Sequence, residues 1–168
     1  MKQRRKRGKN LLLGCLILII ALSAIAMNLR VVPVLIIKNG EDKVVARLPL
    51  HDGQFIHHYI HSIHKTAVDE YFHIKGRNLE LFQVKYDTYG VGMPSDGGEA
   101  FSIEDGRFVV RMNRTFFNIP ILVSIVPQHG VIVEDELFLF TQWVLPESRI
   151  TLSAGRMLIF YNGRSSPK

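Results

Sequence analysis

The chain has 168 residues, of which 47% are hydrophobic, and a formal net charge of +6 at pH 7. This length suits one domain with a core, and the hydrophobic content argues against disorder. The excess positive charge comes from six Lys and Arg residues near the N-terminus, because the other 15 Lys and Arg equal the 15 Asp and Glu. A neutral domain lacks the basic surface that phosphate backbones require, so we expect no nucleic-acid partner.

The N-terminus combines a basic stretch with an apolar run. Residues 1–10 are basic and are expected to stay in the cytoplasm, whereas residues 11–29 are predicted to form a transmembrane signal-anchor. As a helix, the apolar run Leu11–Met27 would be roughly 25 Å long, a marginal span. The alternative is a signal peptide cleaved after Ala26, since Ala24-Ile25-Ala26 has the small-x-small form. Both alternatives predict a bacterial cell-membrane or exported protein whose domain is periplasmic or extracellular.

The single cysteine, Cys15, lies inside this apolar run. The segment Leu12-Leu13-Gly14-Cys15 is similar to a lipoprotein processing site, but most of the apolar run follows the cysteine, whereas a lipobox should end it. A membrane-embedded cysteine without a special role is therefore favoured. The rest of the chain has no thiol, which excludes a disulfide framework, a thiol nucleophile and a cysteine-based zinc site there.

From residue 30 onward, short β-type runs alternate with turn residues. Asn39-Gly40 is a strong hairpin signal, and no later stretch repeats its apolar residues every 3.6 positions. We predict an all-β domain over residues 30–161, an antiparallel β-sandwich or partly open barrel of about ten short strands, followed by a flexible tail at 162–168. The expected strands are Val31–Ile37, Val44–Leu48, Phe55–Ile63, Val68–Ile74, Leu79–Tyr86, Phe101–Ile103, Phe108–Met112, Ile121–Val126, Val131–Phe140, Ile150–Leu152 and Met157–Tyr161.

Histidines are densest in the Phe55–Ile63 run and the turn that follows it. Because side chains alternate along a strand, His57 and His61 should share one face, and His73 follows on the next strand. Imidazoles placed in this way can bind one metal ion, so His57, His61 and His73 are candidate metal ligands. The alternative is a set of half-exposed cross-strand partners, because no carboxylate or cysteine has a recognised zinc spacing. No other cofactor is indicated.

Glu70 alternates with apolar residues on the face expected to be buried. A buried carboxylate needs a partner, and His61, Ser62 or Lys65 across the hairpin could supply one. Glu70 would then belong either to a structural network that fixes strand register or to a ligand site. The set Ser62, His61 and Glu70 also suggests a hydrolase triad. However, no Gly-x-Ser-x-Gly motif occurs and adjacent strand residues face opposite sides, so we expect no catalytic residues.

A glycine-rich stretch, Gly90-Val91-Gly92-Met93-Pro94, follows the next expected strand. Its two glycines can adopt positive φ, and Pro94 cannot continue a sheet ladder. The stretch is interpreted as a tight turn or as the rim of a binding face.

These residues together resemble the bacterial family catalogued as domain of unknown function 1850. The resemblance covers roughly Phe55–Asn118, and this chain has Ala67 where the family typically has proline. Members are short and usually begin with a membrane segment. The residues that carry the resemblance are His61, Ser62, Thr66, Val68, Glu70, Phe72, Gly90, Gly92 and Pro94.

The resemblance implies a function, because members of that family tend to be encoded beside TRAP transporters of the class that uses TAXI substrate-binding proteins. By analogy, the chain is expected to be a non-enzymatic accessory subunit whose partners are the membrane and a TRAP transporter membrane subunit or a TAXI substrate-binding protein. The alternatives are a histidine-based metal- or small-ligand-binding module and an exported hydrolase. The residues expected to form the interaction or ligand surface are His61, Ser62, Thr66, Glu70, Gly90, Gly92 and Pro94.

Overall fold

The computed structural model describes residues 2–88, 90 and 100–160, so the predicted tail at 162–168, together with Gly92 and Pro94, lies outside the described residues. The chain divides into two compact units. One unit comprises residues 1–31 and 158–168, and the other comprises Val32–Met157.

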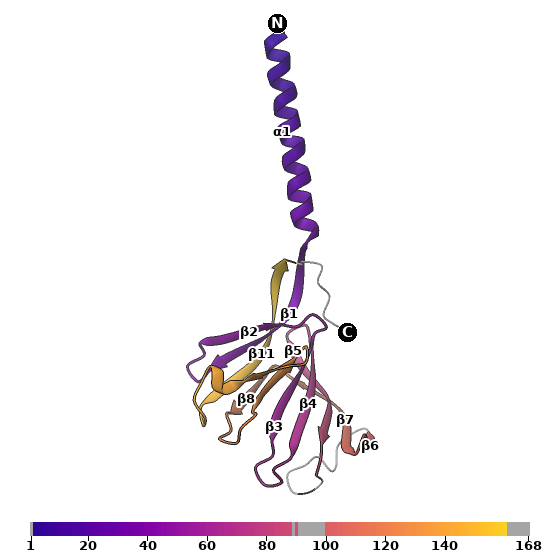
Figure 1. Ribbon diagram of the computed structural model, residues 1–168, viewed down its shortest axis with the longest axis vertical. Coiled ribbons are helices and arrows are strands. Elements are labelled where there is room, and N and C mark those ends of the chain that lie inside the picture. Colours follow the sequence, from indigo (N-terminus) through magenta and orange to yellow (C-terminus); the bar gives the residue numbers. More distant parts are fainter. Residues whose placement is uncertain (1, 89, 91–99, 161–168) are drawn as a thin grey trace. The chain divides into compact units, whose positions relative to one another are not determined.

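The first unit contains helix α1, Lys2–Met27, which includes both the basic stretch and the apolar run (Figure 1). No proline interrupts these residues, and leucine and alanine are good helix formers. Among the residues that the structure describes, no helix is both long enough and apolar enough to cross a membrane.

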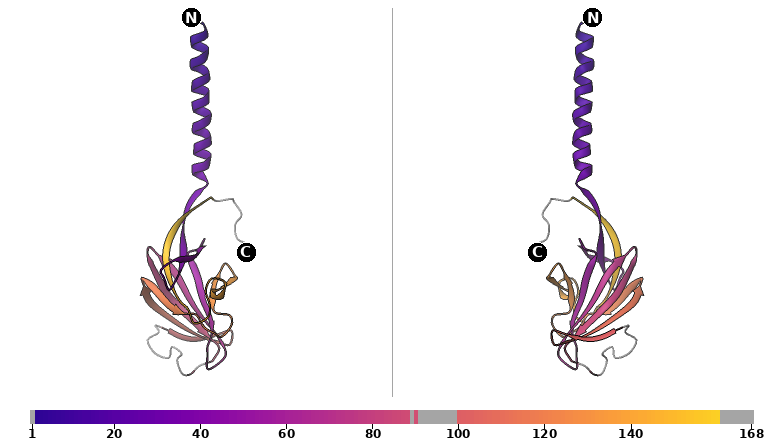
Figure 2. Two further views of the ribbon diagram at one scale, coloured as in Figure 1. Left: turned by 90° about the vertical axis from the view of Figure 1, so that its left-hand side faces the viewer. Right: turned by 90° about the vertical axis from the view of Figure 1, so that its right-hand side faces the viewer.

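The β-strands form two sheets, which Figures 1 and 2 show as separate twisted layers. The smaller sheet has the order β2-β1-β11-β8, and the larger has the order β10-β9-β3-β4-β5-β7-β6. Every strand pair in the larger sheet is antiparallel. The strands are β1 (Leu29–Asn39), β2 (Val44–Pro49), β3 (Gln54–Ile60), β4 (Ala67–Lys75), β5 (Asn78–Tyr86), β6 (Ala100–Glu104), β7 (Arg107–Phe116), β8 (Asn118–Leu122), β9 (Gly130–Val133), β10 (Glu136–Leu139) and β11 (Arg149–Phe160), and a short 3-10 helix, Phe140–Gln142, follows β10.

One apolar core joins the two sheets. Leu35 of β1 and Leu152 of β11 belong to the same buried cluster as Phe55 of β3 and Phe72 of β4. The rings of Phe55 and Phe72 stack with their centroids 5.0 Å apart. The predicted antiparallel β-sandwich is therefore confirmed at the level of its sheets.

The predicted run Val131–Phe140 is wrong as a single strand, because it forms the β9–β10 hairpin. The turn consists of Glu134 and Asp135, whose φ angles are 51° and 65°. Tight hairpin turns need positive φ and usually contain asparagine or glycine. Two acidic residues at these positions gave no such signal in the sequence.

The predicted turn at Ser153-Ala154-Gly155 is also wrong, because β11 continues through it. A Cβ atom at Gly155 would lie 2.6 Å from Cδ1 of Ile36 on the neighbouring strand. The glycine therefore lies where side chains of β1 pack closely on β11, and it does not reverse the chain. The predicted strand Phe55–Ile63 is too long at its C-terminal end, because β3 ends at Ile60.

The inner face of the larger sheet extends beyond the core at β6. Phe101 lies opposite Val110 of β7, which belongs to the buried core, and directly opposed residues share a face. Nevertheless, Phe101 is 53% exposed and Ile103 is 64% exposed. Seven strands packed against four thus leave apolar side chains of the inner face in contact with solvent.

We predict that Gly130→Ala lowers the free energy of unfolding by about 3 kcal/mol or more, because the new Cβ would overlap the Phe138 carbonyl oxygen. Gly40→Ala is the matched control, since its Cβ would lie 3.6 Å from the Arg149 carbonyl oxygen, an ordinary contact. Urea unfolding followed by fluorescence of Trp143, the single tryptophan, measures both variants. Equal stability of the two variants would contradict this account of the β9–β10 hairpin.

Candidate functional site

Buried polar side chains gather on the inner face of β3 and β4. His57 of β3 lies directly opposite Glu70 of β4, and its Nδ1 is 2.8 Å from Glu70 Oε2. Tyr59 is on the same face of β3, where burial and the nearby Glu70 carboxylate raise the pKa of its hydroxyl. Glu70 is therefore an inward-facing carboxylate with a hydrogen-bond partner, but that partner is His57 and not His61, Ser62 or Lys65, as the sequence had suggested.

His129 reaches the same place from the segment just before β9. Its Nε2 lies 2.9 Å from Nε2 of His57, and the two residues are only 6% and 8% exposed. The Phe140 ring packs against both imidazoles, with centroid distances of 5.0 Å to His129 and 6.0 Å to His57. On the far side of His129, the backbone N–H of Ser124 donates to Nδ1 at 2.8 Å. The two rings are thus enclosed and hydrogen-bonded on both nitrogens.

These contacts decide which of the two nitrogens carries the proton in each neutral ring. Because the Ser124 N–H donates to Nδ1 of His129, the neutral His129 ring carries its proton on Nε2. This proton points at Nε2 of His57, which must accept it, so His57 is protonated on Nδ1 and donates to Glu70. Donors therefore run in one direction from Ser124 through both histidines to the Glu70 carboxylate, and the Tyr59 hydroxyl lies near that carboxylate. We call these five residues the histidine chain.

Burial sets the charge state of the histidine chain. It lowers the pKa of His129 to about 4, and the neighbouring imidazoles of His57 and His58 lower it further. Burial together with the Glu70 carboxylate raises the pKa of the Tyr59 hydroxyl, so that it remains a donor. An extra proton on His129 would have to sit on Nδ1, against the N–H of Ser124. The geometry thus accommodates one protonation state.

The same geometry bears on metal binding. A metal ion on Nε2 of His129 would require a proton on Nδ1, and that proton would face the Ser124 N–H. The structure also separates the predicted ligands, since His61 lies beyond the end of β3 and His73 pairs with Glu80 at 3.0 Å and stacks on Phe82. Within residues 2–88, 90 and 100–160, no three His, Cys, Asp or Glu side chains are grouped to hold a metal ion.

The predicted residues His61, Ser62 and Thr66 lie in the turn between β3 and β4. The His61 N–H donates to the Thr66 carbonyl at 2.9 Å, and the Lys65 N–H donates to the His61 carbonyl at 2.8 Å. Lys65 has φ 56°, a left-handed backbone conformation that helps to reverse the chain. The turn explains why the strand stops at Ile60.

His64 links this turn to Gly90. Its ring stacks on His61 with centroids 4.8 Å apart, and a Cβ atom at Gly90 would lie 2.8 Å from His64 Cε1. The structure thus brings His61 and Gly90 of the predicted surface to the same end of the sheet, with His64 between them.

A second polar cluster occupies the outer face of the same two strands. His58 Nδ1 is 2.6 Å from Asp69 Oδ1, and Arg107 Nη1 is 2.6 Å from Asp69 Oδ2. Burial raises the pKa of the Asp69 carboxyl, but hydrogen bonds from His58 and Arg107 outweigh it, and the net pKa is lowered. Arg107 also pairs with Asp87. Asp69 is therefore charged, and each of its carboxylate oxygens has a hydrogen-bond partner.

The geometry can now be compared with known proteins. A family model described as "Domain of unknown function (DUF1850)" matches residues 55–139. The chain belongs to the DUF1850 family. Searches of curated proteins and of solved structures found no match. The matched DUF1850 region is longer than the resemblance at Phe55–Asn118 and includes the whole histidine chain.

Sequence reasoning missed His129, which completes the histidine chain and lies within the DUF1850 region. Its place between Gln128 and Gly130 indicated only a turn before a strand. The one available signal for His129 was its position immediately before the apolar residues that form the mostly buried strand β9. Its partner His57 is 72 positions away, and only the pairing of β3 with β9 brings the two together.

We predict a pH dependence of stability that arises from His129. The unfolded ring binds a proton near its ordinary pKa of 6.5, whereas the folded ring resists protonation until about pH 4. Its contribution is therefore fully present above pH 6.5 and declines as the pH falls toward 4, by about 3 kcal/mol in all. His129→Gln keeps one acceptor and one donor but cannot titrate, so its free energy of unfolding should fall less over this range.

The measurement is urea unfolding of wild type, His129→Gln and His51→Gln at several pH values between 7 and about 4. His51 is an exposed histidine whose side chain is 51% accessible, so its variant should follow wild type. Parallel curves for wild type and His129→Gln would contradict the assigned proton positions.

We predict graded losses of stability along the histidine chain. Tyr59→Phe removes only a hydroxyl near the Glu70 carboxylate and should lower the free energy of unfolding by about 1 kcal/mol at most. Glu70→Ala leaves the buried His57 N–H without its acceptor and should lower it by about 3 kcal/mol. Glu41→Ala, at a 70% exposed side chain, is the control and should change stability little. A loss for Glu70→Ala no larger than that of the control would show that the chain of donors does not support the fold.

Proposed function

We propose that this chain is a non-catalytic interaction module, attached to a membrane by its N-terminal segment, which serves as an accessory subunit of a TRAP-type transporter of the TAXI class. The observation that supports the interaction role is the exposure of two apolar side chains of β6, Phe101 at 53% and Ile103 at 64%. Exposed apolar side chains that line one face of an edge strand are typical of protein interaction sites.

The β6 surface comprises Phe101 and Ile103. Both are more than half exposed, although their partners on β7, Val110 and Phe108, pack in or against the core. The rings of Phe101 and Phe108 pack together with their centroids 5.8 Å apart, so the β6 surface is supported by β7. A partner that covered β6 would extend the apolar core that the smaller sheet leaves incomplete.

The histidine chain supports a non-catalytic role. A general base needs a free lone pair, and a nucleophile needs such a base within hydrogen-bond reach. Both nitrogens of His57 and both nitrogens of His129 are engaged in the chain. In the suggested hydrolase triad, Ser62 is exposed in the β3–β4 turn, whereas Glu70 is hydrogen-bonded to His57. This arrangement favours a structural role for these groups.

The proposed membrane attachment rests on the sequence of α1. Basic residues precede the apolar run, which predicts a cytoplasmic N-terminus and a domain on the opposite side of the membrane. The transporter assignment rests on membership of the DUF1850 family together with the association that the resemblance implies. It is an inference by analogy, which makes a direct test of the partner the first experiment.

We predict that the tagged full-length protein co-purifies from its native membranes, in mild detergent, with a TRAP membrane subunit or a TAXI substrate-binding protein. The double variant Phe101→Ser/Ile103→Ser should lose that partner while remaining folded, because it removes the exposed apolar contacts of β6. Leu145→Ser, at an unrelated residue that is 78% exposed, is the matched control. Mass spectrometry identifies the partners, and Trp143 fluorescence reports folding.

Recovery of the wild-type protein alone from a clean membrane preparation would remove the transporter assignment. Equal recovery of the partner with wild type and the double variant would remove β6 as the contact. Analysis of the mature N-terminus decides between anchor and signal peptide, since a chain that begins at Met27 has been cleaved.

A further inference from the structure

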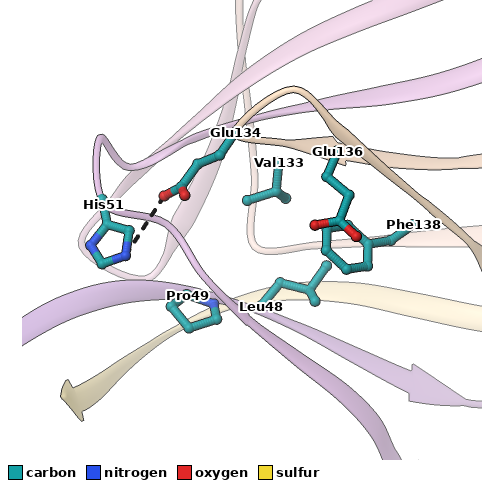
Figure 3. A pocket seen from close by; sticks show the side chains of 7 residues that line it. All are labelled: Leu48, Pro49, His51, Val133, Glu134, Glu136 and Phe138. Carbon is teal, nitrogen blue, oxygen red and sulfur yellow. Dashed lines mark ion pairs between the residues drawn. The ribbon is translucent and has the colours of Figure 1, made fainter. Parts of the chain in front are cut away.

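A cleft of about 290 Å³ opens between the end of β2 and the β9–β10 hairpin (Figure 3). β2 is the outermost strand of the smaller sheet, and β10 is the outermost strand of the larger one. The cleft therefore lies along one edge of the sandwich, where both sheets end. Its lining residues are Leu48, Pro49, His51, Val133, Glu134, Glu136 and Phe138.

The lining combines an apolar floor with an acidic rim. Figure 3 shows Leu48 and Pro49 on one side, and Glu136 and Phe138 of β10 on the other. The Glu134 carboxylate turns toward His51, and its Oε1 is 3.7 Å from His51 Nε2. The lining residues include two carboxylates and one imidazole beside apolar side chains, a combination that suits a positively charged group with an apolar stem.

The backbone beside the cleft is suited to an extended chain. In the described residues, β10 pairs with β9 alone, so the other edge of Glu136–Leu139 has no strand beside it. Edge strands are templates for added strands, and peptide recognition commonly uses them together with pockets for alternate side chains. The cleft thus provides a strand edge, apolar pockets and negative charge at one place.

We propose that this cleft binds an extended basic segment of a partner protein. The segment adds to the free edge of β10, places a lysine or arginine side chain between Glu134 and Glu136, and sets an apolar side chain against Phe138 and Leu48. The volume of about 290 Å³ is at the lower end for small-molecule sites, which fits a side chain better than a cofactor. The inference stands apart from the transporter assignment, because any partner with such a segment would fit.

The test uses the full-length protein in neutral detergent and a short labelled peptide that alternates lysine with threonine and valine. Fluorescence anisotropy measures its dissociation constant, with empty micelles as the blank. We expect binding that weakens with added salt and that weakens about tenfold or more in Glu134→Lys/Glu136→Lys. The matched control, Glu41→Lys/Glu147→Lys, reverses two exposed acidic residues outside the cleft and should bind like wild type.

Further arms separate the possible occupants. The milder Glu134→Gln/Glu136→Gln variant should also weaken binding, which guards against misfolding of the lysine variant, and Trp143 fluorescence checks both. A peptide with N-methylated backbone amides should bind poorly if strand addition contributes. A glutamate version of the peptide that binds equally well, or equal affinities for wild type and both cleft variants, would overturn the proposal. Competition by butylamine as effective as that by the peptide would also overturn it, in favour of a small-amine site.

The transporter and cleft proposals can fail separately. If Glu134→Lys/Glu136→Lys still co-purifies with transporter subunits and binds the lysine peptide like wild type, the transporter role stands and the cleft proposal fails. If peptide binding follows the cleft charges and no transporter subunit is recovered, the cleft stands and the transporter role fails.

Discussion

The hydrogen bond between the two imidazoles, from His129 Nε2 to His57 Nε2, is the interaction on which the interior of the domain depends. It joins a segment before β9 to the centre of β3, and both rings lie beneath Phe140. A polar pair buried among apolar side chains is costly unless every donor and acceptor is used. The Ser124 N–H at one end and the Glu70 carboxylate at the other meet that requirement.

The sequence was sufficient for those features that depend on local pattern. Alternating apolar residues and turn signals predicted the antiparallel sandwich, and the position of Glu70 among apolar neighbours predicted an inward carboxylate with partners. Features that depend on distant contacts were not predictable. Gly155 suggested a turn because a single sequence does not show that Ile36 occupies the space of its missing side chain. The role of His129 was hidden for the same reason, since no periodicity connects it with His57.

The predicted hydrogen-bond partner of Glu70 was wrong because the predicted end of strand β3 was wrong. Extending the strand to Ile63 placed His61 on the face of Glu70, although the strand ends at Ile60 and the chain then turns at Lys65. Once the turn begins, the alternation of faces stops, and His61 instead stacks on His64. The boundary of one element thus decided which histidine met the carboxylate.

The two polar clusters together fix the register of β3 against β4. His57 opposes Glu70 on the inner face, and the next pair, His58 opposite Asp69, lies on the outer face. A slip of one residue would exchange the faces, turning Asp69 into the core and separating it from Arg107. Because one histidine–carboxylate pair lies on each face of the sheet, any shifted register of β3 against β4 is unfavourable. This role accounts for the buried charges, and the two outer strands of the larger sheet, β6 and β10, are where we propose that partners bind.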